Sequence, residues 1–262
     1  MLTKILEDFD IEQIANSGQC FRITKMSNSK WMIKAFGKTL YINKENMNKY
    51  IFDCTEKEYI NIWHDYFDLG TDYSKYKNII RSSGDKYLMD AINFGYGIRI
   101  LRQDLWETIV SFIISQQNNI TRIKRIIERL CCAFGDDFPS PALLKDYSED
   151  DFKKLGLGYR SKYLVGLVRA VLDDSLNLDY IKTLATKDAL AYLQKFHGIG
   201  EKVANCIALF SLHKTEAFPQ DVWIKRIIAT RYTGKFPFNK YATFAGIVQQ
   251  YMFFYERSLK NT

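Results

Sequence analysis

The chain has 262 residues, 47% of them hydrophobic and 15% aromatic, so it can bury a large core as one long or two compact domains, and disorder is excluded. Lysine and arginine outnumber aspartate and glutamate by 37 to 30, and this formal charge of +7 favours an anionic partner such as nucleic acid. Five cysteines without a CxxC pair argue against a disulfide framework and against zinc or iron–sulfur sites.

The first 60 residues alternate short hydrophobic runs with turn residues, and this period of two predicts an antiparallel sheet with one packed face. The segment 17–22, Ser-Gly-Gln-Cys-Phe-Arg, opens the first clear strand. From about residue 56 the spacing of the hydrophobic residues becomes helical. We predict helices at 56–67, 72–80, 85–93, 104–116, 120–134, 149–155, 161–172, 185–195, 201–212, 222–228 and 241–257.

A glycine-containing break at 95–97 follows the first three predicted helices. We expect an α+β fold, with an N-terminal antiparallel sheet domain and flanking helices over 1–95, packed on a mostly α-helical region over 96–262. The helix predicted at 104–116 is apolar on most of its faces, which is typical of the buried central helix of a domain.

A polar segment, Ser-Gln-Gln-Asn-Asn at 115–119, follows this apolar helix. Asn119 can cap the next helix, and amide side chains such as Gln117 also suit the edges of bases, so both interpretations stay open. Arg122 and the other basic residues of the helix at 120–134 form either an ordinary solvated face or a face turned to phosphates.

A second turn of interest is the Gly-Leu-Gly segment at 156–158, which presents Tyr159 and Arg160 together. One side chain can simply pack and the other can be solvated. An aromatic ring and an arginine on one turn also suit insertion into a base stack and a bidentate contact with a base.

Residues 196–200, Phe-His-Gly-Ile-Gly, lie between two predicted helices. We expect Gly198 and Gly200 to adopt backbone conformations that a side chain would forbid, which makes a helix–hairpin–helix. The N–H groups at the start of the second helix can then hold an anion such as a DNA phosphate.

Lys202 lies in the first turn of that second helix, where a cation faces the positive end of the helix dipole. A lone lysine is usually a solvated surface residue, but a neutral amine is also a nucleophile. Asp221 precedes the helical run at 222–228, and we expect it to cap this helix. An aspartate there that faces a cleft can also stabilise a developing sugar cation.

Six short segments form the most specific pattern in the chain, namely Ser-Gly-Gln-Cys-Phe-Arg at 17–22, Leu-Arg-Gln-Asp at 101–104, Asn-Asn-Ile-Thr-Arg-Ile at 118–123, Leu-Gly-Leu-Gly-Tyr-Arg at 155–160, Gly-Glu-Lys-Val-Ala-Asn-Cys at 200–206 and Pro-Gln-Asp-Val at 219–222. Together they resemble the 8-oxoguanine DNA glycosylases of the helix–hairpin–helix superfamily over nearly the whole chain. The hairpin alone would be only moderately specific, because several kinds of DNA-binding protein use one.

The resemblance implies a bifunctional DNA glycosylase/AP lyase of base excision repair that flips 8-oxoguanine out of duplex DNA. Lys202 would attack the sugar C1′ and displace the base, and Asp221 would stabilise the cationic sugar. The resulting Schiff base would lead to strand cleavage by β-elimination. The resemblance implies no redox cofactor and no catalytic metal, only a structural monovalent or calcium ion on the main-chain carbonyls of Gln194, Phe196 and Ile199.

The resemblance also implies how the damaged base is bound. The carbonyl of Gly18 would accept the N7–H that distinguishes oxidised guanine from guanine, while Cys206 and Phe253 would sandwich the base and Gln249 would bind its Watson–Crick edge. Taken alone, Cys206 and Phe253 would be interpreted as core residues, and only the matching register around Gln249 favours a substrate role.

The remaining positions that the resemblance assigns to DNA contact are Gln117, Asn119, Arg122, Tyr159, Arg160, Gly198 and Gly200. Among them, Arg122 and Arg160 would read the orphaned cytosine and Tyr159 would be the wedge. Two positions depart from the mammalian-type pattern, because Gln117 replaces an asparagine near the cytosine and Trp223 replaces a histidine beside Asp221. The preference for the base opposite the lesion therefore stays open.

We expect double-stranded DNA containing oxidised guanine as the partner, no membrane, a monomer, and a cytoplasmic location that is nucleoid-associated if the source is microbial. Two alternatives remain. A helix–hairpin–helix glycosylase for another damaged purine is the nearer one, but a monofunctional alkyl-base enzyme would lack Lys202. A non-catalytic DNA-binding module would not require Lys202 and Asp221 together.

Overall fold

The computed structural model describes residues 1–259, which divide into two compact units. The first unit joins residues 1–102 to the C-terminal part of the chain from residue 213, and the second unit comprises residues 103–212. This division differs from the expected boundary between residues 95 and 96. The C-terminal helix α15 (Ala245–Ser258) packs against α5 (Lys86–Phe94), and this packing places the end of the chain in the same unit as the sheet.

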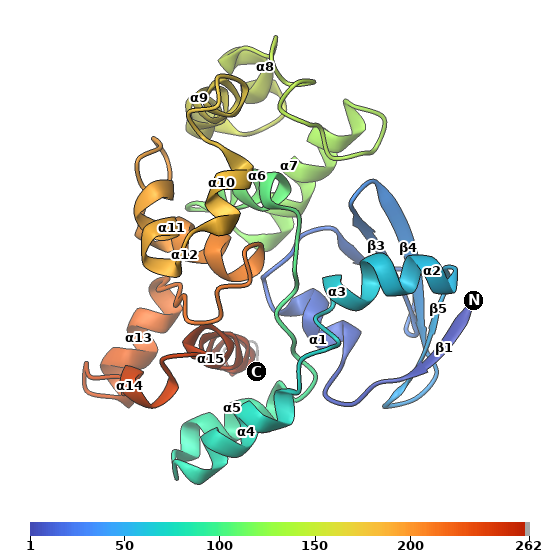
Figure 1. The fold of residues 1–262 in the computed structure, drawn as a ribbon, viewed down its shortest axis with the longest axis vertical. Helices are drawn as coiled ribbons and strands as arrows, with labels where there is room; N and C mark the ends of the chain where they lie inside the picture. The colour runs from blue at the N-terminus through green and yellow to red at the C-terminus, as the bar shows by residue number, and fades with distance from the viewer. Residues whose placement is uncertain (260–262) are drawn as a thin grey trace. The chain divides into compact units, whose positions relative to one another are not determined.

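Five antiparallel strands form the sheet of the first unit in the order β1-β5-β4-β3-β2 (Figure 1). Every second residue of β3 is buried, namely Trp31, Ile33 and Ala35, as expected for a sheet with one packed face. The strands are β1 (Leu2–Ile5), β2 (Ile23–Lys25), β3 (Lys30–Ala35), β4 (Lys38–Lys44) and β5 (Lys49–Phe52).

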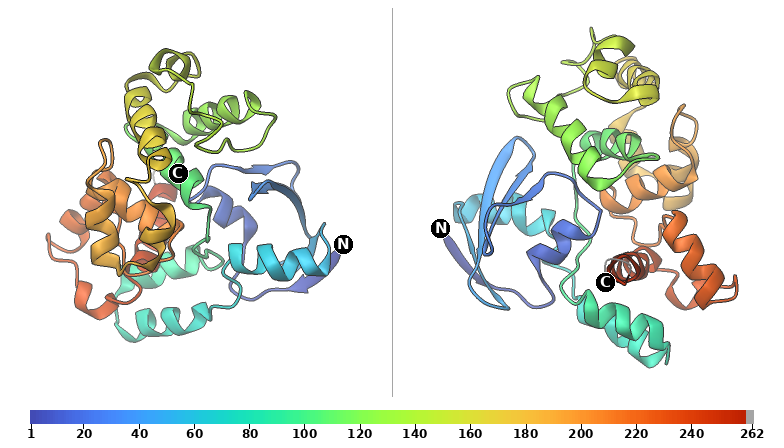
Figure 2. Two further views of the ribbon diagram at one scale, coloured as in Figure 1. Left: turned by 45° about the horizontal axis from the view of Figure 1, so that its top comes forward. Right: turned by 180° about the vertical axis from the view of Figure 1, so that it is seen from behind.

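Helical segments from two parts of the sequence cover the packed face of this sheet (Figures 1 and 2). One is α1 (Ile11–Asn16), whose Ile11 and Ile14 are fully buried. The other runs from residue 56 to 66 and contributes the buried Trp63 to the same core. It consists of α2 (Glu56–Glu58), a π-helical turn (Tyr59–Trp63) and α3 (His64–Tyr66).

The remaining helices of the first unit gather around α15, which packs against both α5 and α13. Because α15 belongs to the C-terminal part of the unit but packs against α5 from the N-terminal part, it connects the two parts. Beside α5 and α15 these helices are α4 (Tyr73–Ser82), α13 (Val222–Arg231) and α14 (Phe238–Tyr241).

The second unit is entirely helical within the described residues 103–212. Its central helix is α6 (Leu105–Ser115), in which nine of eleven residues are buried, and this confirms the expected buried helix. Helix α6 packs against α7, α9 and α12. The helices are α7 (Ile120–Cys132), α8 (Glu149–Lys154), α9 (Ser161–Leu172), α10 (Leu178–Thr183), α11 (Thr186–Leu193) and α12 (Glu201–Phe210), with a 3₁₀ turn at Gly158–Arg160.

The fold class is confirmed, because an N-terminal antiparallel sheet precedes a chain that is mostly helical. The last helix begins at Ala245 rather than at residue 241, because the chain leaves the helical conformation at Phe244 and Gly246 N–H donates to the carbonyl of Thr215. Three short helices, α1, α10 and α14, were not predicted, since four to six residues are too few to show a clear helical period.

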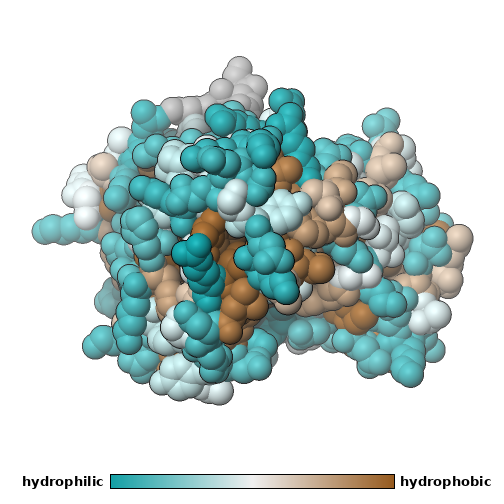
Figure 3. Space-filling view, turned by 90° about the horizontal axis from the view of Figure 1, so that it is seen from above, coloured by the Kyte–Doolittle hydropathy of each residue, from teal (hydrophilic) through white to brown (hydrophobic). Residues whose placement is uncertain are grey.

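All five cysteines are free thiols, in agreement with the expectation from their number and spacing. Among residues 1–259, no helix combines the length and the hydropathy that a membrane span requires. Hydrophilic side chains cover most of the face drawn in Figure 3, and apolar side chains reach it over a smaller area.

Candidate functional site

The hairpin between α11 and α12 uses its two glycines for different reasons. Gly198 has φ +96°, and a Cβ there would lie 2.6 Å from the ring of Tyr163, so the expected need for glycine is confirmed. Gly200 has φ −86° and ψ 178°, a conformation that any residue adopts, so the same expectation is wrong for this position. A Cβ on Gly200 would meet no described atom within 4 Å, and this glycine therefore leaves open space beside the start of α12.

The N-cap residue of helix α12 is Gly200, which has no side chain to cap the helix. The first N–H groups of a helix have no acceptor within it, so they are available to a ligand that approaches Gly200. Lys202 in the first turn is half-buried, and its Nζ lies 5.1 Å from the centre of the Phe112 ring of α6. That ring stacks on Phe210 at the other end of α12. The amine is thus held over an aromatic face rather than fully in solvent.

Cys206 lies one helical turn after Lys202 and shares its side of α12. It is 2% exposed and packs in the second unit, where the alternative interpretation as a core residue also fits. The structure therefore places Lys202 and Cys206 on one helix face, as the substrate role requires.

The end of α6 leads into a tight turn whose main-chain carbonyls are hydrogen-bonded by Arg160. Gln117 in this turn is exposed and has φ +46°, which is uncommon for a residue other than glycine. Arg160 is only 3% exposed, and it makes four hydrogen bonds to the main-chain carbonyls of Gln116, Gln117 and Leu157. Its guanidinium thus binds the main chain of the turn, and the neighbouring Tyr159 remains 45% exposed.

The start of α7 confirms one of the two interpretations of Asn119. Its Oδ1 accepts from the N–H of Arg122 at 2.9 Å, which makes it the cap of this helix. Arg122, Arg125 and Arg129 are exposed along α7 and form the basic face that the sequence predicted. Contact of Asn119 and Arg122 with nucleic acid stays a prediction.

In the first unit, Gly18 and α15 come together although more than 200 residues separate them. Gly18 has φ +77°, and a Cβ there would lie 3.0 Å from the ring of Phe253. Gln249 lies one turn before Phe253 on α15, is 3% exposed, and accepts a hydrogen bond from Gln250 at 3.1 Å. Three of the predicted base-binding residues, Gly18, Gln249 and Phe253, therefore belong to one packed region.

Asp221 caps α13, as expected. Its Oδ1 accepts from the N–H groups of Trp223 at 3.0 Å and Ile224 at 2.9 Å. Burial lowers the pKa of Arg257 on α15, and the negative charge of Asp221 acts on the Arg257 pKa in the opposite direction. The carboxylate thus accepts from a helix terminus and lies within electrostatic reach of a half-buried guanidinium.

Two family models together cover residues 1–235. The 8-oxoguanine DNA glycosylase N-terminal domain matches residues 1–109, and the HhH-GPD superfamily of base excision DNA repair proteins matches residues 110–235. The chain belongs to the 8-oxoguanine DNA glycosylase family. Both matches agree with the fold, since the first contains the sheet and the second contains the hairpin.

Solved structures and a curated relative support this assignment. The chain is similar to MBOgg1, solved with a low-affinity DNA ligand, with a TM-score of 0.92 and 35% identity over 98% of this chain and 95% of that one. It is also similar to the Clostridium acetobutylicum 8-oxoguanine glycosylase/lyase, solved with double-stranded DNA containing cytosine opposite 8-oxoG, with a TM-score of 0.89 and 35% identity over 97% and 93% of the two chains. The Saccharomyces cerevisiae N-glycosylase/DNA lyase is 35% identical over 158 residues, which are 52% of this chain and 42% of that protein, so this chain spans less than half of the curated relative.

The donor set for a structural cation in this family member would be main-chain oxygens. The carbonyl of Phe196 accepts the N–H of Ile199 at 3.0 Å and keeps a second lone pair, which suits an oxygen-seeking cation. Within residues 1–259, no cluster of three or more histidine, cysteine, aspartate or glutamate side chains could hold a metal ion.

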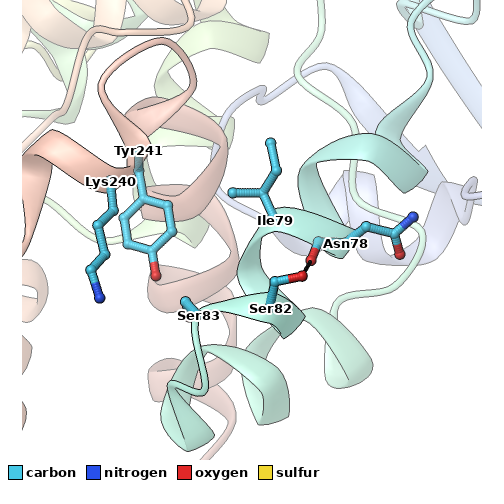
Figure 4. A pocket seen from close by; sticks show the side chains of 6 residues that line it. All are labelled: Asn78, Ile79, Ser82, Ser83, Lys240 and Tyr241. Carbon is cyan, nitrogen blue, oxygen red and sulfur yellow. Dashed lines mark hydrogen bonds between the residues drawn. The ribbon is translucent and has the colours of Figure 1, made fainter.

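A surface pocket of the first unit lies between the end of α4 and α14 (Figure 4). The hydroxyls of Ser82 and Ser83 there donate to carbonyls of their own helix, and they are not directed at a ligand. The lining residues are Asn78, Ile79, Ser82, Ser83, Lys240 and Tyr241, none of which the sequence predicted as functional.

Sequence reasoning missed Gln116 and Phe112. Gln116 donates from Nε2 to the carbonyl of Gly198, a contact across 82 positions that no local pattern could reveal. Phe112 had the signal of an ordinary core residue, because nine of the eleven residues of α6 are buried. Its second role, as the ring beneath Lys202, depends on the packing of α6 against α12.

Proposed function

We propose that this chain is a bifunctional DNA glycosylase/AP lyase that excises 8-oxoguanine from duplex DNA and then cleaves the strand. The observation that carries the proposal is the placement of Lys202, half-buried over Phe112 in the first turn of an uncapped helix and next to a hairpin with open space at Gly200. An amine there is of little use for helix stability, since it faces the positive end of the dipole.

The hairpin binds the DNA backbone. A phosphate approaching Gly200 meets the free N–H groups of α12 and the positive end of its dipole, and Gly198 lets the chain turn tightly enough to present them. A monovalent or calcium ion on the carbonyls of Gln194, Phe196 and Ile199 would add positive charge at the same phosphate.

Lys202 carries the chemistry. Its neutral amine attacks C1′ of the flipped nucleotide, and the C1′–N9 bond breaks with its electron pair leaving on the base, which takes up a proton. Loss of the amine proton and opening of the C1′–O4′ bond give the Schiff base. Removal of a 2′ proton then breaks the C3′–O3′ bond and releases the 3′ phosphate, and water finally hydrolyses the Schiff base.

Asp221 stabilises the positive charge that develops on the sugar as the base departs. A carboxylate has the same use beside the oxocarbenium-like transition states of glycoside hydrolysis. The cap that it provides for α13 fixes the side chain, so it does not have to reorient during the reaction.

The oxidised base is recognised at Gly18, whose carbonyl accepts the N7–H, together with Gln249 on the Watson–Crick edge. Phe253 and Cys206 supply the surfaces against which the base lies. Guanine lacks the N7–H and would leave the carbonyl without a partner, a difference worth about 1–3 kcal/mol.

The opposite strand is contacted from the second unit. Gln117 and Tyr159 are exposed beside the supporting Arg160, and Asn119 and Arg122 follow at the start of α7. A ring such as Tyr159 can enter the base stack that the flipped nucleotide vacates.

The proposal is tested by borohydride trapping on a duplex that carries 8-oxoguanine opposite cytosine. Wild type is expected to form a covalent protein–DNA adduct, because borohydride reduces the Schiff base to a stable amine. Lys202→Gln is expected to form none, while the exposed Lys187→Gln on α11 serves as the matched control and keeps the adduct.

Two results would contradict the proposal. Binding of the duplex without any adduct in wild type would favour a non-catalytic DNA-binding module. An adduct with another damaged purine but not with 8-oxoguanine would keep the lysine chemistry and change the substrate.

A further inference from the structure

Gln116 joins two loops that the proposed function brings to DNA. From its side chain, Nε2 donates to the carbonyl of Gly198 in the hairpin at 3.0 Å. From its main chain, the carbonyl accepts from Nε of Arg160 at 2.9 Å, from Nη2 of the same guanidinium, and from the hydroxyl of Tyr159 at 3.5 Å. One residue at the end of α6 therefore connects the hairpin with the turn at Gly158–Arg160.

On the hairpin side, this contact completes the hydrogen bonding of one peptide group. The Gly198–Ile199 peptide has its carbonyl bound by Gln116 and its N–H bound by the carbonyl of Phe196 at 3.0 Å. A peptide group held at both ends cannot rotate without breaking both bonds. The orientation of the hairpin is thus tied to the position of the Gln116 side chain.

On the other side, the turn is held in a conformation that it would seldom adopt by itself. Gln117 has φ +46°, and Arg160 binds the carbonyls of Gln116 and Gln117, one on each side of the Gln117 Cα. Because Arg160 is 3% exposed and makes its four hydrogen bonds to the main chain, it acts on this turn from within the protein. The exposed side chains that result are those of Gln117 and Tyr159.

We infer that Gln116 is a positioning residue that couples the phosphate-binding hairpin to the turn that faces the opposite strand. This inference rests on the proposed function, which gives both loops their DNA contacts. When the hairpin holds a phosphate, the amide of Gln116 fixes where Gln117 and Tyr159 meet the DNA, and Arg160 keeps the turn rigid. Gln116 and Arg160 therefore act on the same turn.

The test is a double-mutant cycle with Gln116→Met and Arg160→Met. Methionine keeps the length of the glutamine side chain and replaces the aliphatic part of the arginine side chain, and it removes the hydrogen-bond donors of both. The probe is a duplex carrying a tetrahydrofuran abasic analogue opposite cytosine, which cannot form a Schiff base, so its Kd reports binding without chemistry. Each single variant is expected to raise the Kd about tenfold, in line with the loss of a buried hydrogen bond. The Kd of the double variant is expected to rise by about tenfold as well, and not further, because both changes release the same turn.

A second readout separates positioning from chemistry and from folding. At saturating protein, the single-turnover rate of excision from an 8-oxoguanine duplex is expected to stay within about twofold of wild type for Gln116→Met, since the amine of Lys202 is untouched. Thr183→Val is the matched control, because it removes an exposed side-chain bond to the carbonyl of Tyr180 and leaves both readouts unchanged. Gln116→Asn is the second variant in case methionine disturbs folding. Its amide is one methylene too short to reach the carbonyl of Gly198, so it is expected to raise the Kd by the same factor as Gln116→Met.

Multiplicative losses, near about 100-fold in the double variant, would overturn the inference, and so would an unchanged Kd in both Gln116 variants. A fall in Tm with equal losses of binding and rate would show a merely structural residue. Failure of the proposed function gives a different result, because wild type would then bind no abasic duplex or would form no borohydride adduct.

Discussion

The N-termini of α12 and α13 solve the same problem in opposite ways. At α13, Asp221 accepts from the N–H groups of Trp223 and Ile224, so the free donors of the helix are satisfied from within the protein. At α12, the N-cap residue is Gly200, which has no side chain to accept from these groups. The terminus of α13 is thus capped by the protein itself, whereas the terminus of α12 is open to a ligand.

The charges at the two termini follow the same division. An anion at the start of α13 is stabilised by the helix dipole, whereas the cation Lys202 at the start of α12 is not. The neighbouring Glu201 lies in the same first turn and is favoured by the dipole, so the unfavourable position of Lys202 concerns its own amine and not the whole terminus. The missing side-chain cap together with this amine is what we explain by binding and chemistry. Asp221 is different, because stability accounts for it completely and a catalytic role has to be separated from its cap.

The largest expected effect is that of Asp221→Asn on base excision. Asparagine keeps the side-chain oxygen that caps α13 but has no negative charge to stabilise the sugar cation. Single-turnover excision on an 8-oxoguanine duplex is expected to slow by about 100-fold, the scale found when one electrostatic stabiliser is removed from an active site. The Tm and the Kd for the abasic duplex are expected to remain close to wild type.

Asp221→Ala is the control for this prediction, since it removes the cap together with the charge. It is expected to lower the free energy of unfolding by about 1 kcal/mol, the usual cost of a lost N-cap. Equal destabilisation by asparagine and alanine, or normal excision by Asp221→Asn, would leave Asp221 as a cap alone.

The second prediction concerns the hairpin that leads into α12. Gly198→Ala is expected to destabilise the protein by about 2 kcal/mol, because alanine is strained at φ +96° and its Cβ would lie 2.6 Å from the ring of Tyr163. Chemical denaturation measures this loss. Gly200→Ala at φ −86° has room for its Cβ and should lose far less stability, so similar losses at the two glycines would contradict the geometry described above.

These two glycines also show how far sequence reasoning reaches. The pattern Gly-x-Gly correctly predicted a hairpin, but glycine occurs at these two positions for two different structural reasons. A positive φ at Gly198 and open space at Gly200 can be told apart only when the surrounding atoms are placed. Caps were easier, because an asparagine or aspartate just before a helix needs only local geometry. Asp221 was predicted as a cap, and a cap was one of the two interpretations of Asn119.

Long-range packing explains most of what the sequence could not predict. The period of two and the helical period identified the sheet and the longer helices, but neither period shows that α15 returns to α5 or that Gln116 reaches Gly198. Arg160 illustrates the same point. An arginine after a glycine turn is expected at the surface, and its burial follows from three carbonyls that converge only in the folded chain.

The smallest expected effect in stability is the most direct test of the comparison, because it converts one helix terminus into the other. Gly200→Asp places a carboxylate at the N-cap of α12 with the extended backbone that a cap requires. The protein should gain a few tenths of a kcal/mol in the free energy of unfolding, since aspartate is a slightly better cap than glycine.

The same substitution should weaken binding of the abasic duplex by about tenfold or more, because the new side chain takes the N–H groups and repels the phosphate. Gly200→Ser separates the two causes, since serine caps without adding charge, and Kd values at matched salt show how much of the loss is repulsion. Unchanged affinity in both variants would mean that DNA does not use the terminus of α12. Gly200 would then be an ordinary turn residue, and the open end of α12 would require a different explanation.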